Sequence, residues 1–207
     1  MEDVLEVYRR PYDANYPVIC MDETCKQLIS DVAKPIPVAP GHPLLVDHEY
    51  VRNGVAEIFL EVEPLAGKRH VEVTERRGRK EWAEFVQGML EQRYPDAVKV
   101  VLVMDNLNTH NNTASLYERF PAEQARRLAE RLEIHHTPKH GSWLDIAEIE
   151  LSVLARQCLN HRIETIEAMR TEVQAWNSDR DNRQTKVNWH FTCDDARIKL
   201  RRLYPSL

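Results

Sequence analysis

The feature that most constrains the fold is the apolar run Val98–Met104, which stops on Asp105 and continues into the polar stretch Asn106–His110. A continuous run rich in β-branched residues and bounded by turn-forming residues is typical of a central strand covered on both faces. In open α/β sheets, functional sites gather beyond the carboxyl ends of the strands, which is where Asp105 is expected to lie. By itself the run leaves a second interpretation open, in which Asp105 only caps a turn or the following helix.

Composition indicates one globular domain in an ordinary soluble protein. The chain has 207 residues, of which 43% are hydrophobic and 29% are charged, and this size allows a sizeable core without disulfides. No run approaches the roughly 18 apolar residues of a membrane span, and the acidic N-terminus does not resemble a signal peptide. We therefore expect a cytoplasmic protein with no membrane partner. The four scattered cysteines are expected to be reduced thiols.

The net charge of −5 argues against a protein that binds nucleic acid over its whole surface. Local basic patches remain candidates for DNA contact, although each of them is also compatible with a simple solvated face. These patches comprise Arg76, Arg77, Arg79 and Lys80, then Arg126, Arg127 and Arg131, and finally Arg197, Lys199, Arg201 and Arg202.

Residues 1–16 are interpreted as a linker or N-terminal extension, and residues 17–207 as the domain. Its first strand, 17–21, is apolar and is expected to end on the acids Asp22 and Glu23. After a long proline-containing loop from Ser30 to Val51, residues 55–63 alternate between apolar and polar, which predicts a half-buried strand. Residues 70–75 then return as its antiparallel partner.

The second half of the domain alternates helices with strands before a helical C-terminal part. An apolar stripe over 82–90 predicts a helix that leads into the 98–104 strand, and Pro121 opens another helix before a short strand at 133–137. Further helices are expected over 145–159, from 166 onward after a Thr165 cap, and from a capping-box-like start at Thr192 through Leu203. This order predicts an α/β fold: a ribonuclease H-like mixed five-stranded sheet flanked by helices, with extra C-terminal helices.

The predicted topology places the first and fourth strands side by side, so Asp22 and Asp105 are expected to meet at one edge of the sheet. Two carboxylates there repel unless a cation lies between them, and hard oxygen ligands suit Mg²⁺ or Mn²⁺. A third acid from the helix after residue 144 completes a two-ion site for cleaving phosphodiesters. Residue spacing alone leaves that third acid open among Asp145, Glu148 and Glu150.

Four stretches resemble the catalytic domain of DDE transposases of the bacterial insertion-sequence 630 family, in the mariner-type superfamily. They are VICMDE (18–23), VMDNLNTH (103–110), HHTPKHGSWLDIAEIE (135–150) and NWHFT (188–192). The resemblance implies that Asp22, Asp105 and Glu148 are the catalytic acids and bind two Mg²⁺ or Mn²⁺ ions. Residue 145, usually Asn in this pattern, is Asp here, which either adds a metal contact or raises the cost of leaving the site empty.

The same resemblance implies a metal-dependent DNA endonuclease and strand transferase. Such an enzyme cuts transposon ends and joins the 3′-hydroxyl to target DNA, with TA as the expected target and a homodimer as the expected assembly. A catalytically silent DNA-binding or assembly module derived from a transposase is the alternative hypothesis. An RNA-directed hydrolase fits the metal chemistry but not the motifs.

Several further residues have two open interpretations each. Asn106 either holds the carboxylate of Asp105 or caps the turn, and His110 either approaches the phosphate and the acids or is a polar turn residue. Lys139 and His140 either contact phosphate or are simply solvated. Trp143 either packs in the core or stacks on a base near the cut strand.

Overall fold

A mixed five-stranded sheet organises the chain in the computed structural model, which describes residues 1–105, 113–139 and 141–204. The strand order is β3-β2-β1-β4-β5. The strands are β1 (Val18–Asp31), β2 (Tyr50–Glu63), β3 (Lys68–Thr74), β4 (Val100–Met104) and β5 (Leu132–His136). β1 runs antiparallel to β2 and parallel to β4, and β4 is parallel to β5. The predicted ribonuclease H-like arrangement is therefore confirmed.

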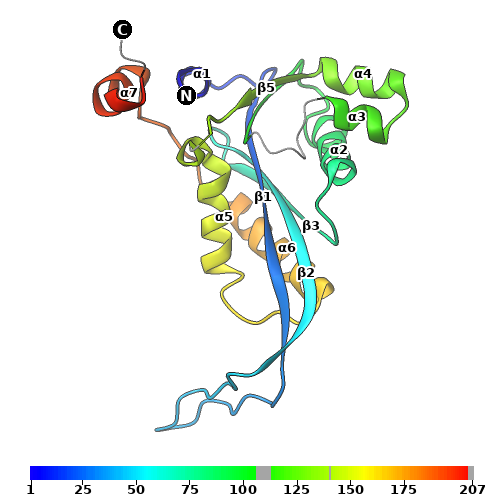
Figure 1. Cartoon of the computed structure of the whole chain (residues 1–207), viewed down its shortest axis with the longest axis vertical. Coiled ribbons are helices and arrows are strands. Elements are labelled where there is room, and N and C mark those ends of the chain that lie inside the picture. Colours follow the sequence, from blue (N-terminus) through cyan, green and yellow to red (C-terminus); the bar gives the residue numbers. More distant parts are fainter. Residues whose placement is uncertain (106–112, 140, 205–207) are drawn as a thin grey trace.

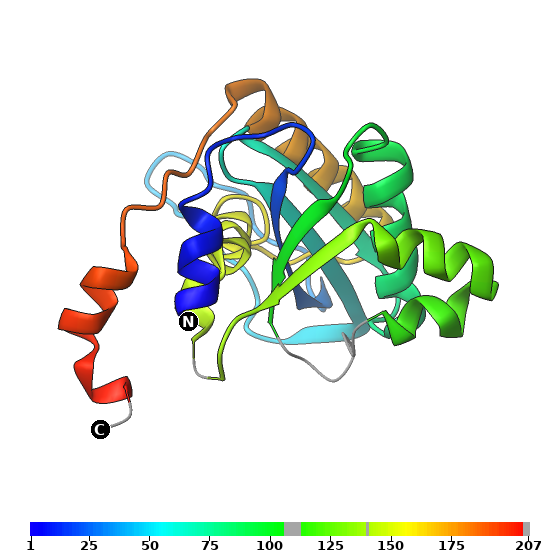
Figure 2. The ribbon, with the colours of Figure 1, turned by 90° about the horizontal axis from the view of Figure 1, so that it is seen from above.

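Helices cover both faces of the sheet (Figures 1 and 2). Side chains of α1, α5, α6 and α7 share one buried cluster with one face, and those of α2, α3 and α4 share a second cluster with the other. The α-helices are α1 (Glu2–Tyr8), α2 (Arg79–Gly88), α3 (Ala114–Arg119), α4 (Ala122–Glu130), α5 (Ile146–Gln157), α6 (Ile166–Arg183) and α7 (Cys193–Lys199). Shorter turns are the π-helical η1 (Met89–Arg93) and the 3₁₀ turns η3 (Ser142–Leu144) and η4 (Arg201–Leu203). In the described part of the chain, no helix is both long and apolar enough to cross a membrane.

The predicted central strand is β4, and all five of its residues are fully buried. Val101 and Val103 belong to the cluster under α5 and α6, whereas Val100, Leu102 and Met104 belong to the cluster under α2 to α4. Successive side chains of a strand point to opposite faces. A continuous apolar run is therefore what a strand between two helical layers requires.

β1 differs from the expected short strand that ends on acid. Its parallel pairing with β4 ends at Met21 opposite Met104, but its antiparallel pairing with β2 continues as far as Asp31 opposite Tyr50. Asp22 and Glu23 consequently lie inside a 14-residue strand, just past the point where one neighbour stops. The hydrogen bonds to β2 keep the polar residues extended, which the apolar pattern alone does not reveal.

β2 is buried on both faces at its carboxyl end, so the prediction of a half-buried strand is wrong there. Phe59 packs in the second core cluster, and Glu61 is 1% exposed. Arg93 of η1 holds the Glu61 carboxylate in a two-point contact, with Nε 2.5 Å from Oε1 and Nη2 3.0 Å from Oε2. A buried carboxylate with such a bidentate partner occupies a position that the alternating pattern assigns to solvent.

The N-terminal segment contains an element that the sequence analysis did not expect. α1 buries Val4, Leu5 and Val7 in the core cluster shared with α5 and α6. Its contacts reach the far end of the chain, because Glu2 accepts hydrogen bonds from Arg197 Nε and Nη2, each at 2.8 Å. Residues 2–8 are thus packed against the domain.

Local capping signals were read correctly at two later helices. Thr165 accepts a hydrogen bond from Ala168 N at the start of α6, and Thr192 and Asp195 form a complete capping box at α7. α7 ends at Lys199 and is followed by η4, whereas one helix through Leu203 was expected. α3 was not expected, and Pro121 is the N-cap residue of α4.

Residues 32–49, here called the arm, connect β1 to β2 and project far from the body of the molecule (Figure 1). They were predicted to be an irregular loop, and their backbone pairing in the structure consists of two isolated bridges, Ile36 to Leu45 and Ala39 to His42. Arg162 fastens the base of the arm, with Nη1 2.5 Å from Asp31 Oδ1 and Nη2 2.7 Å from Asp47 O.

Candidate active site

Carboxylates gather where the parallel pairing of β1 and β4 ends. Asp22 follows Met21, the last β1 residue paired with β4, and Asp105 follows Met104, the last residue of β4. One carboxylate oxygen from each of Asp22, Glu23 and Asp105 lies within 4.8 Å of the others. The topology thus brings together the two acids that the sequence placed at one edge and adds Glu23.

Glu23 was not among the predicted site residues. Neighbouring strand residues usually point to opposite faces, so its proximity to Asp22 was not expected from the pattern. Glu23 is 7% exposed, and its backbone N–H donates to Asp22 Oδ1 at 2.8 Å. The signal in the sequence that indicates Glu23 is its position directly after Asp22.

Asp22 lies in an environment that disfavours its charge. Burial raises its pKa to about 7. The negative charges of Asp105, Glu23 and Glu148 raise the same pKa, while the hydrogen bond from the Glu23 backbone lowers it. Of these three charges that of Glu148 has the smallest effect, and Glu148 is not one of the residues whose carboxylate oxygens lie within 4.8 Å of one another.

The start of α5 delivers two further acids to this region. Asp145 is the N-cap residue, and its Oδ1 accepts a hydrogen bond from Ala147 N at 2.8 Å. Glu148 follows in the first turn and is half-buried. An Asp at the N-cap satisfies an otherwise unpaired N–H group, which explains why the helix begins here.

Asp145 is almost completely buried, at 1% exposed, and its Oδ2 has no hydrogen-bond partner among the described residues. Burial raises its pKa well above the usual range, and the charges of Asp22, Glu148 and Asp105 add to the effect. The departure from Asn at this position therefore places an additional acid beside the cluster.

Glu150 is directed elsewhere, so it does not compete for the site. Its Oε1 lies 3.0 Å from Nε of Arg69, whose side chain is fully buried, and 2.6 Å from Nη2 of Arg180. These contacts join α5 to β3 and α6. The structure therefore separates Glu150, which is held in an internal ion network, from Asp145 and Glu148 at the start of α5.

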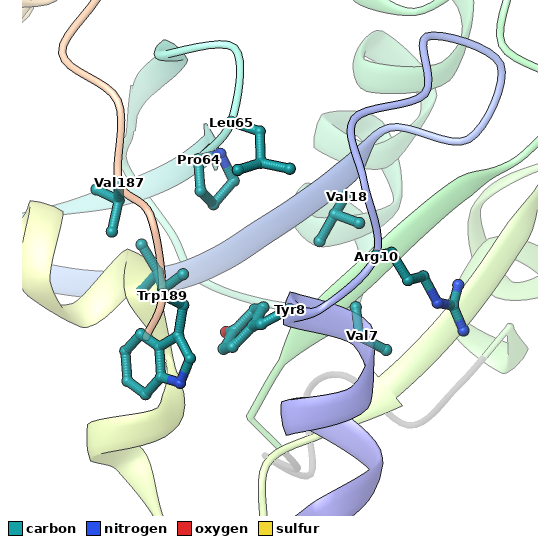
Figure 3. A pocket seen from close by; sticks show the side chains of 9 residues that line it. Val7, Tyr8, Arg10, Val18, Pro64, Leu65, Val187 and Trp189 are labelled. Atoms are coloured by element: carbon teal, nitrogen blue, oxygen red, sulfur yellow. The ribbon is translucent and has the colours of Figure 1, made fainter. Parts of the chain in front are cut away.

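The turn before α5 is held by α1. The Tyr8 hydroxyl donates to Leu144 O at 2.6 Å, and the Tyr8 ring lies 5.3 Å from that of Trp189 between centroids. Figure 3 shows both side chains lining a small apolar recess, which none of the clustered carboxylates lines. Support for the start of the acid-bearing helix thus comes from a segment that sequence reasoning treated as a linker or extension.

The remaining predicted site residues are not joined to the acids by the described contacts. Asn106, His110 and His140 lie outside the described residues. Lys139 is exposed after β5. In the basic patch, Arg77 Nε lies 3.8 Å from Glu57 Oε2 and Arg79 pairs with Glu118, while Arg76 and Lys80 are exposed.

The donor set suits a hard divalent cation. Its described members supply oxygen atoms only, and Mg²⁺ or Mn²⁺ favours carboxylate oxygen. A cation between the carboxylates relieves the repulsion that raises the pKa of Asp22.

The sheet has the ribonuclease H-like arrangement and gathers carboxylates where the parallel pairing of β1 with β4 ends. The chain belongs to the DDE superfamily endonuclease family, whose model matches residues 17–170. No match is found among curated proteins.

Solved transposase structures share the fold. The Mos1 strand transfer complex superposes with a TM-score of 0.60 at 14% identity, over 89% of this chain and 54% of that chain. The Mos1 mariner paired-end complex with Mn gives a TM-score of 0.57 at 15% identity, over 89% and 54% of the two chains. The Mos1 paired-end complex with left transposon end gives 0.58 at 15% identity, over 89% and 56%. The chain thus spans about half the length of these proteins.

Proposed function

We propose that this chain is the catalytic domain of a transposase of the insertion-sequence 630 type. It acts as a metal-dependent DNA endonuclease and strand transferase that cuts transposon ends and joins the freed 3′-hydroxyl to target DNA. The observation that carries the proposal is the set of carboxylate oxygens of Asp22, Glu23 and Asp105 within 4.8 Å, on a chain of the DDE endonuclease family.

Asp22, Asp105 and Glu148 are the proposed catalytic residues, and their carboxylates would hold two Mg²⁺ or Mn²⁺ ions. Bound ions of this kind activate the attacking hydroxyl and stabilise the leaving oxygen of a phosphodiester. Glu23 is an additional oxygen donor beside Asp22. Asp145 fixes the first turn of α5 through Ala147 N and thereby positions Glu148.

DNA is the proposed substrate and partner, with TA as the target. Exposed Lys139 and the patch formed by Arg76, Arg77, Arg79 and Lys80 are the proposed phosphate contacts, as is His140 beside Lys139. Phosphate contacts of this kind contribute affinity that falls with salt, which allows an acidic chain to bind DNA through local patches. Asn106 and His110 remain proposed supports of Asp105.

A homodimer is the proposed assembly. The arm and the adjoining start of β2 expose many large apolar side chains, a pattern typical of protein interfaces. They are Val32, Ile36, Val38, Leu44, Leu45, Val46, Tyr50, Val51 and Val55. A second copy that covers this projecting surface removes it from water without any change in the body of the domain.

Metal binding and DNA cleavage test the catalytic proposal together. Calorimetry with Mn²⁺ is expected to show binding to the wild type and severe weakening in Asp105→Ala. Nicking of supercoiled plasmid is expected to vanish in Asp105→Ala and Glu148→Gln, because each substitution removes a proposed metal ligand. Asp96→Asn removes an exposed carboxylate elsewhere and is the matched control.

Two results contradict the proposal. If wild type and Asp105→Ala bind Mn²⁺ equally, or if neither binds, the acids are not the metal site. If the metal binds but no plasmid is nicked while DNA is still bound, the chain is the silent DNA-binding or assembly module instead. An RNA–DNA hybrid is the control substrate for an RNA-directed activity.

A further inference from the structure

Four aromatic side chains form a continuous group beside the start of α5. Trp143 stacks on Trp189 with ring centroids 6.4 Å apart and meets the edge of Phe191 at 5.6 Å. Trp189 in turn contacts Tyr8. We call Tyr8, Trp143, Trp189 and Phe191 the aromatic group.

Trp143 is an exposed aromatic residue in a short turn that backbone hydrogen bonds hold. It is 40% exposed, whereas its neighbour Leu144 is fully buried. The turn is closed by Leu144 N donating to Gly141 O at 3.0 Å and Asp145 N donating to Ser142 O at 2.7 Å. The ring packs against Trp189 and Phe191, and its exposed part presents a rigid apolar surface to solvent.

The chain connects this ring directly to the candidate active site. Trp143 stands two residues before the cap Asp145 and five before Glu148, with one 3₁₀ turn between ring and helix. Tyr8 fixes the same turn through Leu144 O. Whatever rests on Trp143 is therefore held by the segment that also positions the acids at the start of α5.

Cationic side chains accompany the aromatic group. Lys199 Nζ lies 5.4 Å from the centroid of Phe191 and 3.2 Å from Asp195 Oδ1. Lys139 is exposed four residues before Trp143 in the sequence, and Arg201 and Arg202 are exposed after α7. Aromatic rings for stacking together with basic groups for the backbone are the features by which proteins hold single-stranded nucleic acid.

We propose that Trp143 is a stacking platform for one unpaired nucleobase of the DNA strand that enters the acid site. The proposal rests on the proposed function for its ligand, since it takes DNA as the substrate. The ring supplies a rigid apolar surface, and Trp189 and Phe191 keep it in place before DNA arrives. Stacking requires no particular base, so the platform recognises the unpaired state of a strand and not its sequence.

Binding measured in EDTA tests the platform without any cleavage. Two probes are used: a duplex with a short unpaired 3′ overhang and a fully paired duplex of the same length. Trp143→Ala is expected to weaken binding of the overhang probe roughly five- to hundred-fold, with little change for the paired probe. Trp143→Phe keeps a stacking ring and is expected to retain most of the preference. Tyr117→Ala, which removes another exposed aromatic side chain, is the matched control.

A second measurement uses the unaltered protein, so that it stays informative if Trp143→Ala fails to fold. An overhang that contains 5-iodouracil is expected to cross-link to Trp143 on irradiation, as located by mass spectrometry of the peptides. Cross-links confined to other residues overturn the proposal. The proposal is also overturned if Trp143→Ala weakens binding of the paired and the overhang probe equally. It is overturned as well if Trp143→Ala changes the oligomeric state and leaves DNA binding intact, because Trp143 is then a contact between protein chains.

The outcomes for the platform and for the proposed function are separable. Loss of the overhang preference in Trp143→Ala, combined with no plasmid nicking by the wild type, supports the platform and rejects the nuclease. Nicking that depends on Asp105, combined with an unchanged overhang preference in Trp143→Ala, rejects the platform and supports the nuclease.

Discussion

Asp145 both caps α5 and adds a buried carboxyl group, and a substitution can remove one of these properties without the other. Its Oδ1 caps α5 through Ala147 N, while its Oδ2 is buried and has no hydrogen-bond partner in the part of the chain that the structure describes. Asparagine keeps the capping oxygen and removes the buried charge. We therefore predict that, in EDTA, Asp145→Asn is more stable to urea than Asp145→Ala by about 1 kcal/mol, the usual value of an N-cap.

The raised pKa of Asp145 makes the stability of the wild type depend on pH. The folded state holds a proton that the unfolded state releases, so this group makes stability fall as pH rises above the ordinary range of a carboxyl. Asparagine has no such proton to lose. The stability advantage of Asp145→Asn over the wild type is thus expected to grow with pH, and an advantage that shrinks with pH contradicts the burial of a charged Asp145.

Asp22 carries a pH prediction for metal binding. Its pKa is raised to about 7, so below that pH the metal-free carboxyl keeps a proton that a cation must displace. Mn²⁺ affinity is expected to be roughly ten-fold weaker near pH 6 than near pH 8 and to level off above that. Calorimetry in buffers of different ionisation enthalpy counts the protons released. Affinity that is independent of pH excludes this role for Asp22.

At the scale of elements, α5 carries two acids with different expected effects on stability, Glu148 and Glu150. Glu150 neutralises Arg69, whose side chain is fully buried, and Arg180. Removing one partner of a buried ion pair strands the other, so Glu150→Ala is expected to lose about 3–5 kcal/mol of unfolding free energy. Glu148→Ala removes a repulsive charge near Asp22 and is expected to keep or gain stability while losing Mn²⁺ binding.

Urea unfolding and Mn²⁺ calorimetry on these two variants distinguish the roles. A large loss of stability in Glu148→Ala contradicts its assignment to the metal site. Unchanged stability in Glu150→Ala contradicts the proposed contribution of the internal ion network.

Elements with a strong local signal were predictable from the sequence. β4 follows from an uninterrupted apolar run, and the starts of α6 and α7 follow from Thr165 and Thr192 as caps. α1 and α3 lack such a signal, because their short turns gain stability from burial against distant parts of the chain. The full length of β1 likewise depends on pairing with β2 beyond Asp22, which involves residues far apart in sequence.

The candidate site was predictable to the extent that topology determines it. Two strands that end their mutual pairing at Met21 and Met104 place Asp22 and Asp105 together. Glu23 was missed because strand alternation assigns it to the other face. The different roles of Glu148 and Glu150 could not be predicted, because Glu150 is identified by its contacts with Arg69 on β3 and Arg180 on α6. Those contacts join residues that are far apart in the sequence.

At the scale of the whole molecule, the two helical layers bury the sheet, whereas the arm projects from the body (Figure 1). Several large apolar side chains of the arm are exposed. Arg162 holds its base, so the arm is fastened to the body at one end. A projecting apolar segment is costly for a monomer to expose and suits contact with a second copy. If the protein is a homodimer, substitutions in the arm are therefore expected to weaken dimerisation most.

A triple substitution tests this: Ile36→Ser, Val38→Ser and Leu45→Ser in one variant. Because all three side chains are more than half exposed, at 61%, 73% and 55%, their loss is expected to leave the unfolding free energy nearly unchanged. Sedimentation is expected to show concentration-dependent dimers for the wild type and monomers for the variant. Ile198→Ser, at an exposed apolar site on α7, is the matched control and is expected to dimerise normally. A triple variant that dimerises like the wild type locates the interface elsewhere, and a wild type that stays monomeric at every concentration rejects the homodimer.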